Sequence, residues 1–421
     1  MGSNESHRLT GDAMSLAKIA DIVVIGGGVL GTSAAFHLSN AGRWNIVLID
    51  RGPIASGTTP FAAGQTGYLS SNRFALEFGT YCIEFFEQFE ERTGYAINFR
   101  QSGSLRIALT EQYQRDLQAR YKAAQGLGHD VEFISPGRAR ELVPLLEPTD
   151  DCRILHIPRD GYVEPKSVAV AYAVAARDRG VAIHTRVAAT NLYIVDGRVR
   201  AVCTSEGTIE TEWVVLAAGA WTRQFGQQLG LNLRTVPVRH QAFVTAPMSN
   251  VLTLQPIVRV TEPQVYVRQE TRGLLVGGYG YRPLSFDMND FPADFQIPAL
   301  QADPVYYEQL TEAATKFFPA LRDAVVVKEL RGLPTISPDG RLLVSESKEI
   351  AGLIVVSACG VGGISRSPGV GRVVAEIVGG QQTWLSPSVL SIDRFGDVYA
   401  DESHLQSRCV EVYAHHYHDV Y

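Results

Sequence analysis

Three glycines, Gly26, Gly28 and Gly31, have the G-x-G-x-x-G spacing that lets a backbone approach a diphosphate closely. They follow the apolar β-branched run 22–25 and precede a pattern typical of a helix. A second apolar run ends in Asp50, about 20 residues further on, where a carboxylate accepts hydrogen bonds from ribose hydroxyl groups. This order of strand, glycine turn, helix, strand and acid predicts a dinucleotide site. It does not separate NAD from FAD, because both contain an ADP half.

A second glycine-rich loop, SACGVGGISRSPGVG, occupies residues 357–371, directly after the strand-like run 353–356. Ser367 is a candidate N-cap and Pro368 a candidate first residue of a helix. The positive end of that helix would favour the negative charge of a reduced flavin. Residues 51–70 are small and hydroxylated, which is typical of a loop that wraps a flavin, although an ordinary surface loop remains the alternative.

The length, composition, net charge and cysteine count predict a soluble two-domain protein of the cytoplasm. The chain has 421 residues, 45% of them hydrophobic, which exceeds a typical single domain. A net charge of -6 gives no sign of a nucleic-acid partner. Five scattered cysteines suggest a reducing compartment, and no signal peptide or membrane span is expected. Residues 1–17 have the composition of a flexible tail.

Several motifs in this order resemble the D-amino acid oxidase superfamily of FAD-dependent amine oxidoreductases, in the branch of glycine oxidase, sarcosine oxidase and dimethylglycine dehydrogenase. The motifs are IGGGVLGTSAAFHL, GTTPFAAG, VVLAAGAW, VYVRQETRGLLVGG, GLPTISPDGRLLV and GVGGISRSPGVG. The resemblance implies an α/β fold with two domains. A discontinuous Rossmann-like FAD-binding domain would comprise residues 18–75, 150–235 and 331–385. An α+β substrate domain with a largely antiparallel sheet would comprise 76–149 and 236–330, and 386–421 would form a C-terminal extension.

The resemblance also implies which residues contact FAD. The diphosphate and ribose would meet the first glycine loop and Asp50, and the flavin would meet the second loop. The candidate cofactor-binding residues are Gly26, Gly28, Val29, Leu30, Gly31, Asp50, Arg51, Thr58, Thr59, Ala63, Gly64, Val187, Gly219, Trp221, Gly362, Gly363 and Ile364. Phe61 occupies the position of the flavin-linking histidine of dimethylglycine dehydrogenases, so we expect non-covalent FAD.

The substrate site departs from the family pattern. Tyr266 aligns with a substrate-site tyrosine of glycine oxidase, but Pro334 replaces its carboxylate-binding arginine and Ser365 replaces a lysine of sarcosine oxidase. Arginine forks are the usual carboxylate anchors. The remaining candidates are Arg331 and Arg366, with His240 and Arg239 as further options.

The predicted function is FAD-dependent oxidation of a C–N bond in an amino acid or an N-substituted glycine. A hydride would pass to flavin N5, water would hydrolyse the imine, and O2 would reoxidise the flavin to give H2O2. The alternatives are a dehydrogenase that passes electrons to a carrier, an NAD-dependent dehydrogenase, and a flavin-binding module without turnover. No metal site is predicted: His415, His416 and His418 lie near the chain end and are expected to face solvent. A homo-oligomer is a possible assembly.

Overall fold

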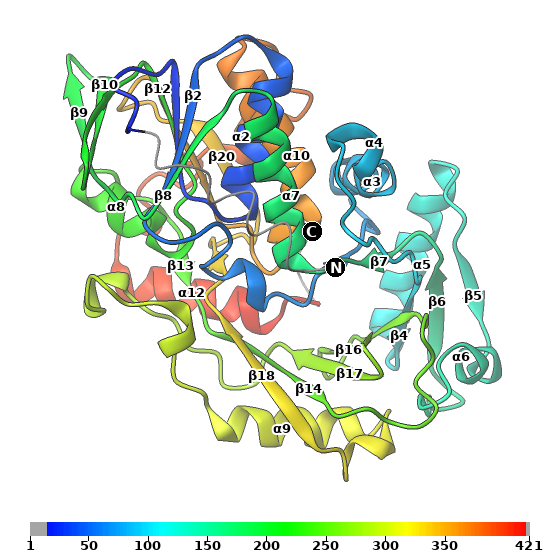
Figure 1. Ribbon diagram of the computed structural model, residues 1–421. Helices are drawn as coiled ribbons and strands as arrows, with labels where there is room; N and C mark the ends of the chain where they lie inside the picture. The colour runs from blue at the N-terminus through cyan, green and yellow to red at the C-terminus, as the bar shows by residue number, and fades with distance from the viewer. Residues whose placement is uncertain (1–14, 418–421) are drawn as a thin grey trace.

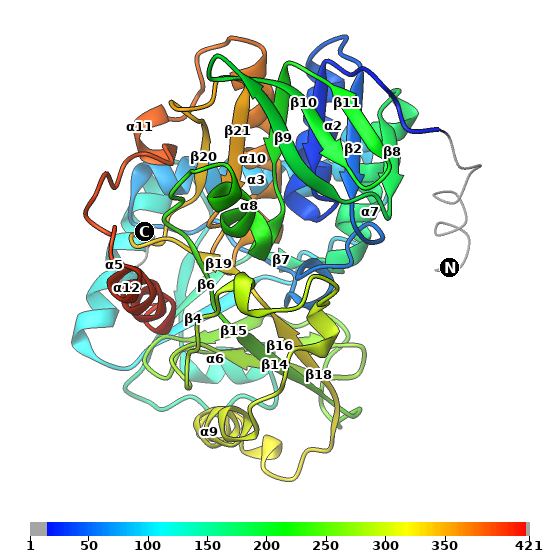
Figure 2. The ribbon, with the colours of Figure 1, turned by 90° about the vertical axis from the view of Figure 1, so that its left-hand side faces the viewer.

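The computed structural model describes residues 15–417, which form two large sheets in separate parts of the molecule (Figures 1 and 2). One sheet has six strands and is mostly parallel, and the other has eight and is mostly antiparallel. This arrangement confirms the predicted fold class. Among the described residues, no helix is long and apolar enough to cross a bilayer.

The six-stranded sheet has the order β20-β21-β12-β1-β2-β8 and is parallel except for β20. Its strands come from three widely separated stretches of the chain, as expected for a discontinuous domain. They are β1 (Ile22–Ile25), β2 (Ile46–Asp50), β8 (Ala182–Thr185), β12 (Trp213–Leu216), β20 (Leu343–Glu346) and β21 (Leu353–Ser357).

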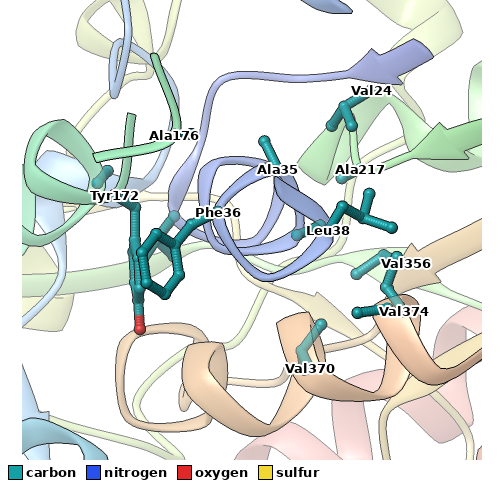
Figure 3. Close-up of a cluster of buried hydrophobic side chains, with 14 of the residues drawn as sticks. Val24, Ala35, Phe36, Leu38, Tyr172, Ala176, Ala217, Val356, Val370 and Val374 are labelled. Carbon is teal, nitrogen blue, oxygen red and sulfur yellow. The ribbon is translucent and has the colours of Figure 1, made fainter. Parts of the chain in front are cut away.

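Helices cover one face of this sheet and a small sheet covers the other. Helix α2 (Val29–Ala41) lies between α7 (Pro165–Asp178) and α10 (Gly363–Val378), with Phe36 beside Tyr172 of α7 (Figure 3). The opposite face packs on a three-stranded sheet of β9 (Ala189–Val195), β10 (Arg198–Thr204) and β11 (Gly207–Glu210). Because side chains alternate along a strand, β1 is apolar throughout and contributes to both layers.

Helix α10 begins at Gly363, four residues before the predicted N-cap at Ser367, so that prediction was wrong. Pro368 lies inside the helix and has no N–H to donate to the carbonyl of Ile364. The Ser367 hydroxyl donates to that carbonyl instead, at 2.9 Å. A serine side chain therefore satisfies the carbonyl that the proline leaves without its usual backbone donor.

Burial of His37 between helices predicts a pH-dependent stability. Burial lowers the pKa of His37 to about 4, against 6.5 in the unfolded chain. The unfolded state therefore binds more protons between these values, and the stabilisation present above pH 6.5 is lost as the pH falls through this window. We expect His37 alone to lower the free energy of unfolding by about 2 kcal/mol when the pH falls from 7 to 5. Urea unfolding of His37→Gln should show a shallower pH dependence, and exposed His415→Gln should match the unmodified protein.

The eight-stranded sheet has the order β18-β14-β17-β16-β15-β4-β6-β5, in which only β15 and β4 pair in parallel. Its strands are β4 (Ser104–Ala108), β5 (Glu132–Ile134), β6 (Arg153–Ile157), β14 (His240–Thr245), β15 (Ile257–Val260), β16 (Val265–Glu270), β17 (Gly273–Gly278) and β18 (Val326–Gly332). One face packs its alternate apolar side chains on α9 (Pro304–Thr315), which lies below the sheet in Figure 1. The other face is therefore available to line a cavity.

The structure bears on several expected boundaries. Strand β6 pairs with β4 and β5, so we propose that the second FAD-domain segment begins near residue 158 and not at 150. Leu16 and Ala17, from the expected tail, pack against the core, and residues 1–14 lie outside the described residues.

The other helices are α3 (Arg73–Glu87), α4 (Phe89–Thr93), α5 (Glu111–Gly126), α6 (Pro136–Leu142), α8 (Thr222–Gln228), α11 (Pro387–Leu390) and α12 (Glu402–Ala414). The remaining strands are the two-residue pairs β3 (Gln65–Thr66) with β7 (Gly161–Tyr162) and β13 (Val236–Pro237) with β19 (Thr335–Ile336).

Candidate active site

One large cavity, of about 1100 Å³, is lined by residues of both large sheets. Its volume slightly exceeds the range of roughly 300–1,000 Å³ found for most small-molecule sites. The first glycine loop, residues 56–65 and the second glycine loop line one part of it. Side chains of β4, β14, β15 and β16 line the other part. The cavity can therefore hold an extended cofactor and a substrate together.

The three glycines of the first loop have different structural roles. A Cβ on Gly26 would lie 2.3 Å from the carbonyl oxygen of Ala217, and one on Gly31 would lie 1.9 Å from that of Gly26. Both glycines are therefore required for backbone packing between β1, β12 and α2. A Cβ on Gly28 would meet only Thr59 Oγ1, at 3.4 Å. Gly28 lines the cavity, and its missing side chain leaves room for a ligand there.

Asp50 is held at the end of β2 by two backbone donors. Its Oδ2 accepts from the N–H of Gly27 and its Oδ1 from that of Gly52, both at 2.6 Å. Burial raises the pKa of the Asp50 carboxyl, although these N–H groups oppose the shift. Carboxylate oxygens have further acceptor capacity, so Asp50 can also accept from the hydroxyls of a ribose. Next to it, the Arg51 guanidinium stacks on the ring of Trp221, 3.9 Å from the ring centre, and both residues line the cavity.

Sixteen of the seventeen candidate cofactor residues line the cavity. The exception is Gly31, which lies behind Gly26 and shapes the loop. Val187 lines the cavity, but its N–H already donates to the carbonyl of Asp50 at 2.9 Å, which leaves its carbonyl oxygen for a ligand. Gly362, Gly363 and Ile364 place the N-terminus of α10 at the cavity, as Val29 and Leu30 do for α2. Two helix N-termini thus lie at one cavity, where their positive ends favour an anion.

The cavity face of the eight-stranded sheet carries a row of polar side chains on paired residues. Arg106 of β4 pairs in register with Arg259 of β15, which pairs with Tyr266 of β16, and Tyr266 pairs with Gly277 of β17. Register partners point to the same face, so the two guanidinium groups and the phenol lie side by side. All three side chains line the cavity.

The two arginines of this row differ in their partners. Arg259 forms a buried ion pair with Asp160, with Nη1 2.9 Å from Oδ2, and its Nε donates to Gln65. Arg106 forms no ion pair among the described residues, and its buried Nε lacks a hydrogen-bond partner there. Burial, with the positive charges of Arg120 and Arg259, lowers the pKa of Arg106 to about 10. Arg106 thus remains a cation at neutral pH, and an anion in the cavity would compensate its charge.

His240 joins two tyrosines. Its Nε2 lies 2.7 Å from Tyr266 Oη, and its Nδ1 lies 2.7 Å from Tyr413 Oη. Burial lowers the pKa of His240 to about 4, so the imidazole is neutral at physiological pH. Tyr279 lies against the ring, with centroids 5.2 Å apart.

Gly277 provides the space for the Tyr266 hydroxyl. A Cβ on this residue would lie 2.1 Å from Tyr266 Oη. We expect Gly277→Ala to displace the phenol, break its bond to His240 and lower kcat/KM by about tenfold or more. A crystal structure of the variant should show the phenol moved. An unchanged phenol position together with unchanged kcat/KM would contradict this role.

The predicted substrate residues fall into two groups. Tyr266, His240 and Arg366 line the cavity, and Arg366 also donates to the carbonyl of Cys359. Arg331 is absent from the cavity lining and pairs with Glu329, while Arg239 pairs with Asp303. The position of Arg331 therefore does not support its predicted role as an anchor.

Several residues that line the cavity were not predicted from the sequence. Arg106 and Arg259 are single charges within the apolar runs SLRIA and IVRV, a pattern that signals a strand with one polar face. His416 and Tyr417 also line the cavity, so the expectation of solvent exposure was wrong for His416. It was correct for His415, which is exposed, while His418 lies outside the described residues.

Comparison with known proteins identifies the family of this chain. A model of the FAD dependent oxidoreductase family matches residues 21–377. The chain belongs to this family. It is 29% identical over 97% of its length to the pyruvate dehydrogenase phosphatase regulatory subunit of Mus musculus, covering 47% of that protein. It is 31% identical over 85% of its length to dimethylglycine dehydrogenase of Rattus norvegicus, covering 42%. It thus spans about half the length of these relatives.

Among solved structures, glycine oxidase from Geobacillus kaustophilus is similar, with a TM-score of 0.76 and 26% identity. The alignment covers 90% of this chain and 99% of that one. These matches confirm the resemblance inferred from the motifs, and FAD is the cofactor of the family. The cavity fits this cofactor: the open side of Gly28, the oriented Asp50 carboxylate and two helix N-termini are suited to ribose, diphosphate and flavin.

Proposed function

We propose that the protein uses FAD to oxidise a C–N bond in an amine that carries a carboxylate, such as an N-substituted glycine. The observation that carries the proposal is the row Arg106, Arg259 and Tyr266 on one face of the FAD cavity. Two adjacent guanidinium groups and a phenol suit a carboxylate, because charge-assisted hydrogen bonds are the strongest available to it. When bound, FAD supplies the acceptor for the hydride that leaves the carbon next to nitrogen.

The charges of the cavity also favour the neutral form of a bound amine. A C–N bond is oxidised from the neutral amine, because an ammonium has no lone pair to stabilise the developing iminium. Arg106 and Arg366 bring positive charge to the cavity, Arg259 is paired with Asp160, and His240 remains neutral. Like charges and burial both disfavour an ammonium ion, so the pKa of a bound amine falls. Water then hydrolyses the iminium product to an amine and a carbonyl compound.

We propose that FAD is held non-covalently and that O2 is the electron acceptor, giving H2O2. The similarity to glycine oxidase over nearly its whole length supports this acceptor. A second candidate function is a flavin-binding module without turnover. It is supported by the name of one relative, the pyruvate dehydrogenase phosphatase regulatory subunit. The cytoplasmic location stays a prediction, because several relatives are named as mitochondrial.

Spectroscopy of the purified holoenzyme separates these possibilities. Glycine, sarcosine, N,N-dimethylglycine, N-carboxymethyl amines, proline and D-amino acids are each mixed with it without air, and the flavin absorbance is followed. The proposal predicts bleaching by at least one N-substituted glycine, and no bleaching by any compound favours the module. Air is then admitted: reoxidation slower than that by an artificial acceptor would assign a dehydrogenase. Acid precipitation should release the flavin into the supernatant.

A further inference from the structure

The C-terminal helix contributes a residue to the hydrogen bonds of the substrate site. Tyr413, in the last turn of α12, contacts His240 from the side opposite to Tyr266. Both tyrosines are buried, each with 1% of its surface exposed, but only Tyr266 is among the residues that line the cavity. The three residues form a chain from the protein interior to the cavity.

All three members of this chain are neutral. Burial raises the pKa of both Tyr266 and Tyr413 well above its usual value, so each phenol keeps its proton. Burial lowers the pKa of His240 to about 4, so the imidazole carries a single N–H. Each of the three residues thus carries one proton that it can donate. The two hydrogen bonds can therefore run in only two directions, either from Tyr266 toward Tyr413 or from Tyr413 toward Tyr266.

The first direction leaves a buried donor without an acceptor. If Tyr266 donated to His240 Nε2, the Nδ1–H group would donate to Tyr413 Oη. The Tyr413 hydroxyl proton would then have no acceptor, because His240 is its only hydrogen-bond partner among the described residues. An unsatisfied buried hydroxyl is unfavourable.

The second direction satisfies every group. Tyr413 donates to Nδ1, the Nε2–H group donates to Tyr266 Oη, and the Tyr266 hydroxyl proton is left for the cavity. A ligand or a water molecule in the cavity can accept it. This direction agrees with the adjacent row, because Arg259 and Tyr266 are register partners that can donate to one carboxylate.

We propose that Tyr413 is a positioning residue that fixes His240 as the Nε2–H tautomer and thereby directs the Tyr266 hydroxyl proton toward the carboxylate of the substrate. This inference rests on the proposed function for the identity of the acceptor, but not for the direction of the chain. The donor at the substrate is thus set by a residue outside 21–377, the range of the family match.

Helix α12 is anchored well enough for this role. At its start, Glu402 forms an ion pair with the buried Arg223. In its middle, Arg408 Nε donates to the carbonyl of Pro338 at 3.0 Å. At its end, the side-chain amide of Gln264 donates to the carbonyl of Ala414. Gln264 immediately precedes β16, so the strand that carries Tyr266 also holds the end of the helix.

The tautomer is tested by 15N NMR of the FAD holoenzyme labelled in its 10 histidines, with His240→Gln used to identify the signals of His240. The proposal predicts a protonated Nε2 and an unprotonated Nδ1 in the unmodified protein. A protonated Nδ1 would overturn it. This measurement needs neither substrate nor turnover, so its result is independent of whether the proposed function holds.

The role of Tyr413 is tested with Tyr413→Phe, and Tyr193→Phe is the control because it removes the hydroxyl of an exposed tyrosine outside the cavity lining. Acetate serves as the carboxylate probe, followed by the absorbance of bound flavin. We expect Tyr413→Phe to show a mixture of tautomers and to bind acetate about tenfold more weakly, since one charge-assisted hydrogen bond is compromised. An unchanged tautomer and an unchanged acetate Kd would refute the role of Tyr413. Failure of acetate to bind the unmodified protein would instead count against the proposed function.

Discussion

Replacing Arg106 with methionine is expected to raise the KM for a carboxylate-bearing amine by about 100-fold, because a buried charge pair with the substrate is lost. Methionine fills a similar space without charge, so the cavity keeps its shape. The variant should bind FAD normally. Its melting temperature should be equal or higher, because Arg106 is a partly buried cation whose Nε is buried and which has no acidic partner among the described residues. Steady-state kinetics and thermal unfolding of the holoenzyme check both outcomes.

The control for this variant is Arg322→Met, which removes an exposed arginine. It should leave KM unchanged. The loss in Arg106→Met should also be specific to the carboxylate, so an amide analogue of the same substrate should lose much less. An unchanged KM in Arg106→Met, or an equal loss with acid and amide, would refute the assignment of Arg106 as an anchor.

Alanine substitutions at Gly31 and Gly28 should affect different properties. In Gly31→Ala the new Cβ would lie 1.9 Å from a backbone oxygen, so α2 must move away from β1. We expect a loss of about 3 kcal/mol of stability in the FAD-free protein, with loss of FAD binding as a consequence. In Gly28→Ala the Cβ has room, at 3.4 Å from Thr59 Oγ1. Stability of the FAD-free protein should change by less than about 1 kcal/mol, while FAD affinity falls about tenfold or more.

Urea unfolding of both proteins without FAD, together with titration by FAD fluorescence, separates the two effects. Equal destabilisation by both substitutions would show that Gly28 also serves packing. Normal FAD affinity in a stable Gly28→Ala variant would contradict the proposal that the cofactor lies against this residue.

The local pattern of the sequence was enough to predict the unit of β1, α2 and β2. Its strand, turn and helix lie consecutively in the chain, and each is specified by residues within a short window. The start of α10 was predicted wrongly because the local rule for Ser367 and Pro368 competes with tertiary packing. Gly371 faces α2 so closely that a Cβ would lie 2.5 Å from Ser33 Oγ. Ser33 in turn donates to the carbonyl of Ser367, which anchors the helix on α2.

The substrate side could not be predicted from the sequence because strand register decides it. Arg331 is paired with Gln241, one residue from the pair of His240 with Gly332. Because successive side chains point to opposite faces of a sheet, Arg331 faces away from the side that carries His240. Arg106 and Arg259 are far apart in the chain and become neighbours only through the pairing of β4 with β15. Such long-range pairing leaves no local signature.

The most direct measurement compares flavin reduction by an N-substituted glycine with reduction by its amide. The holoenzyme is mixed without air with sarcosine or sarcosinamide, or with the acid and amide of whichever panel member bleaches the flavin best. The proposed carboxylate site predicts that the acid bleaches the flavin at a concentration about 100-fold lower than the amide does, because Arg106, Arg259 and Tyr266 would hold its carboxylate. Equal reduction by acid and amide, or no reduction by any carboxylate-bearing amine, would contradict the account.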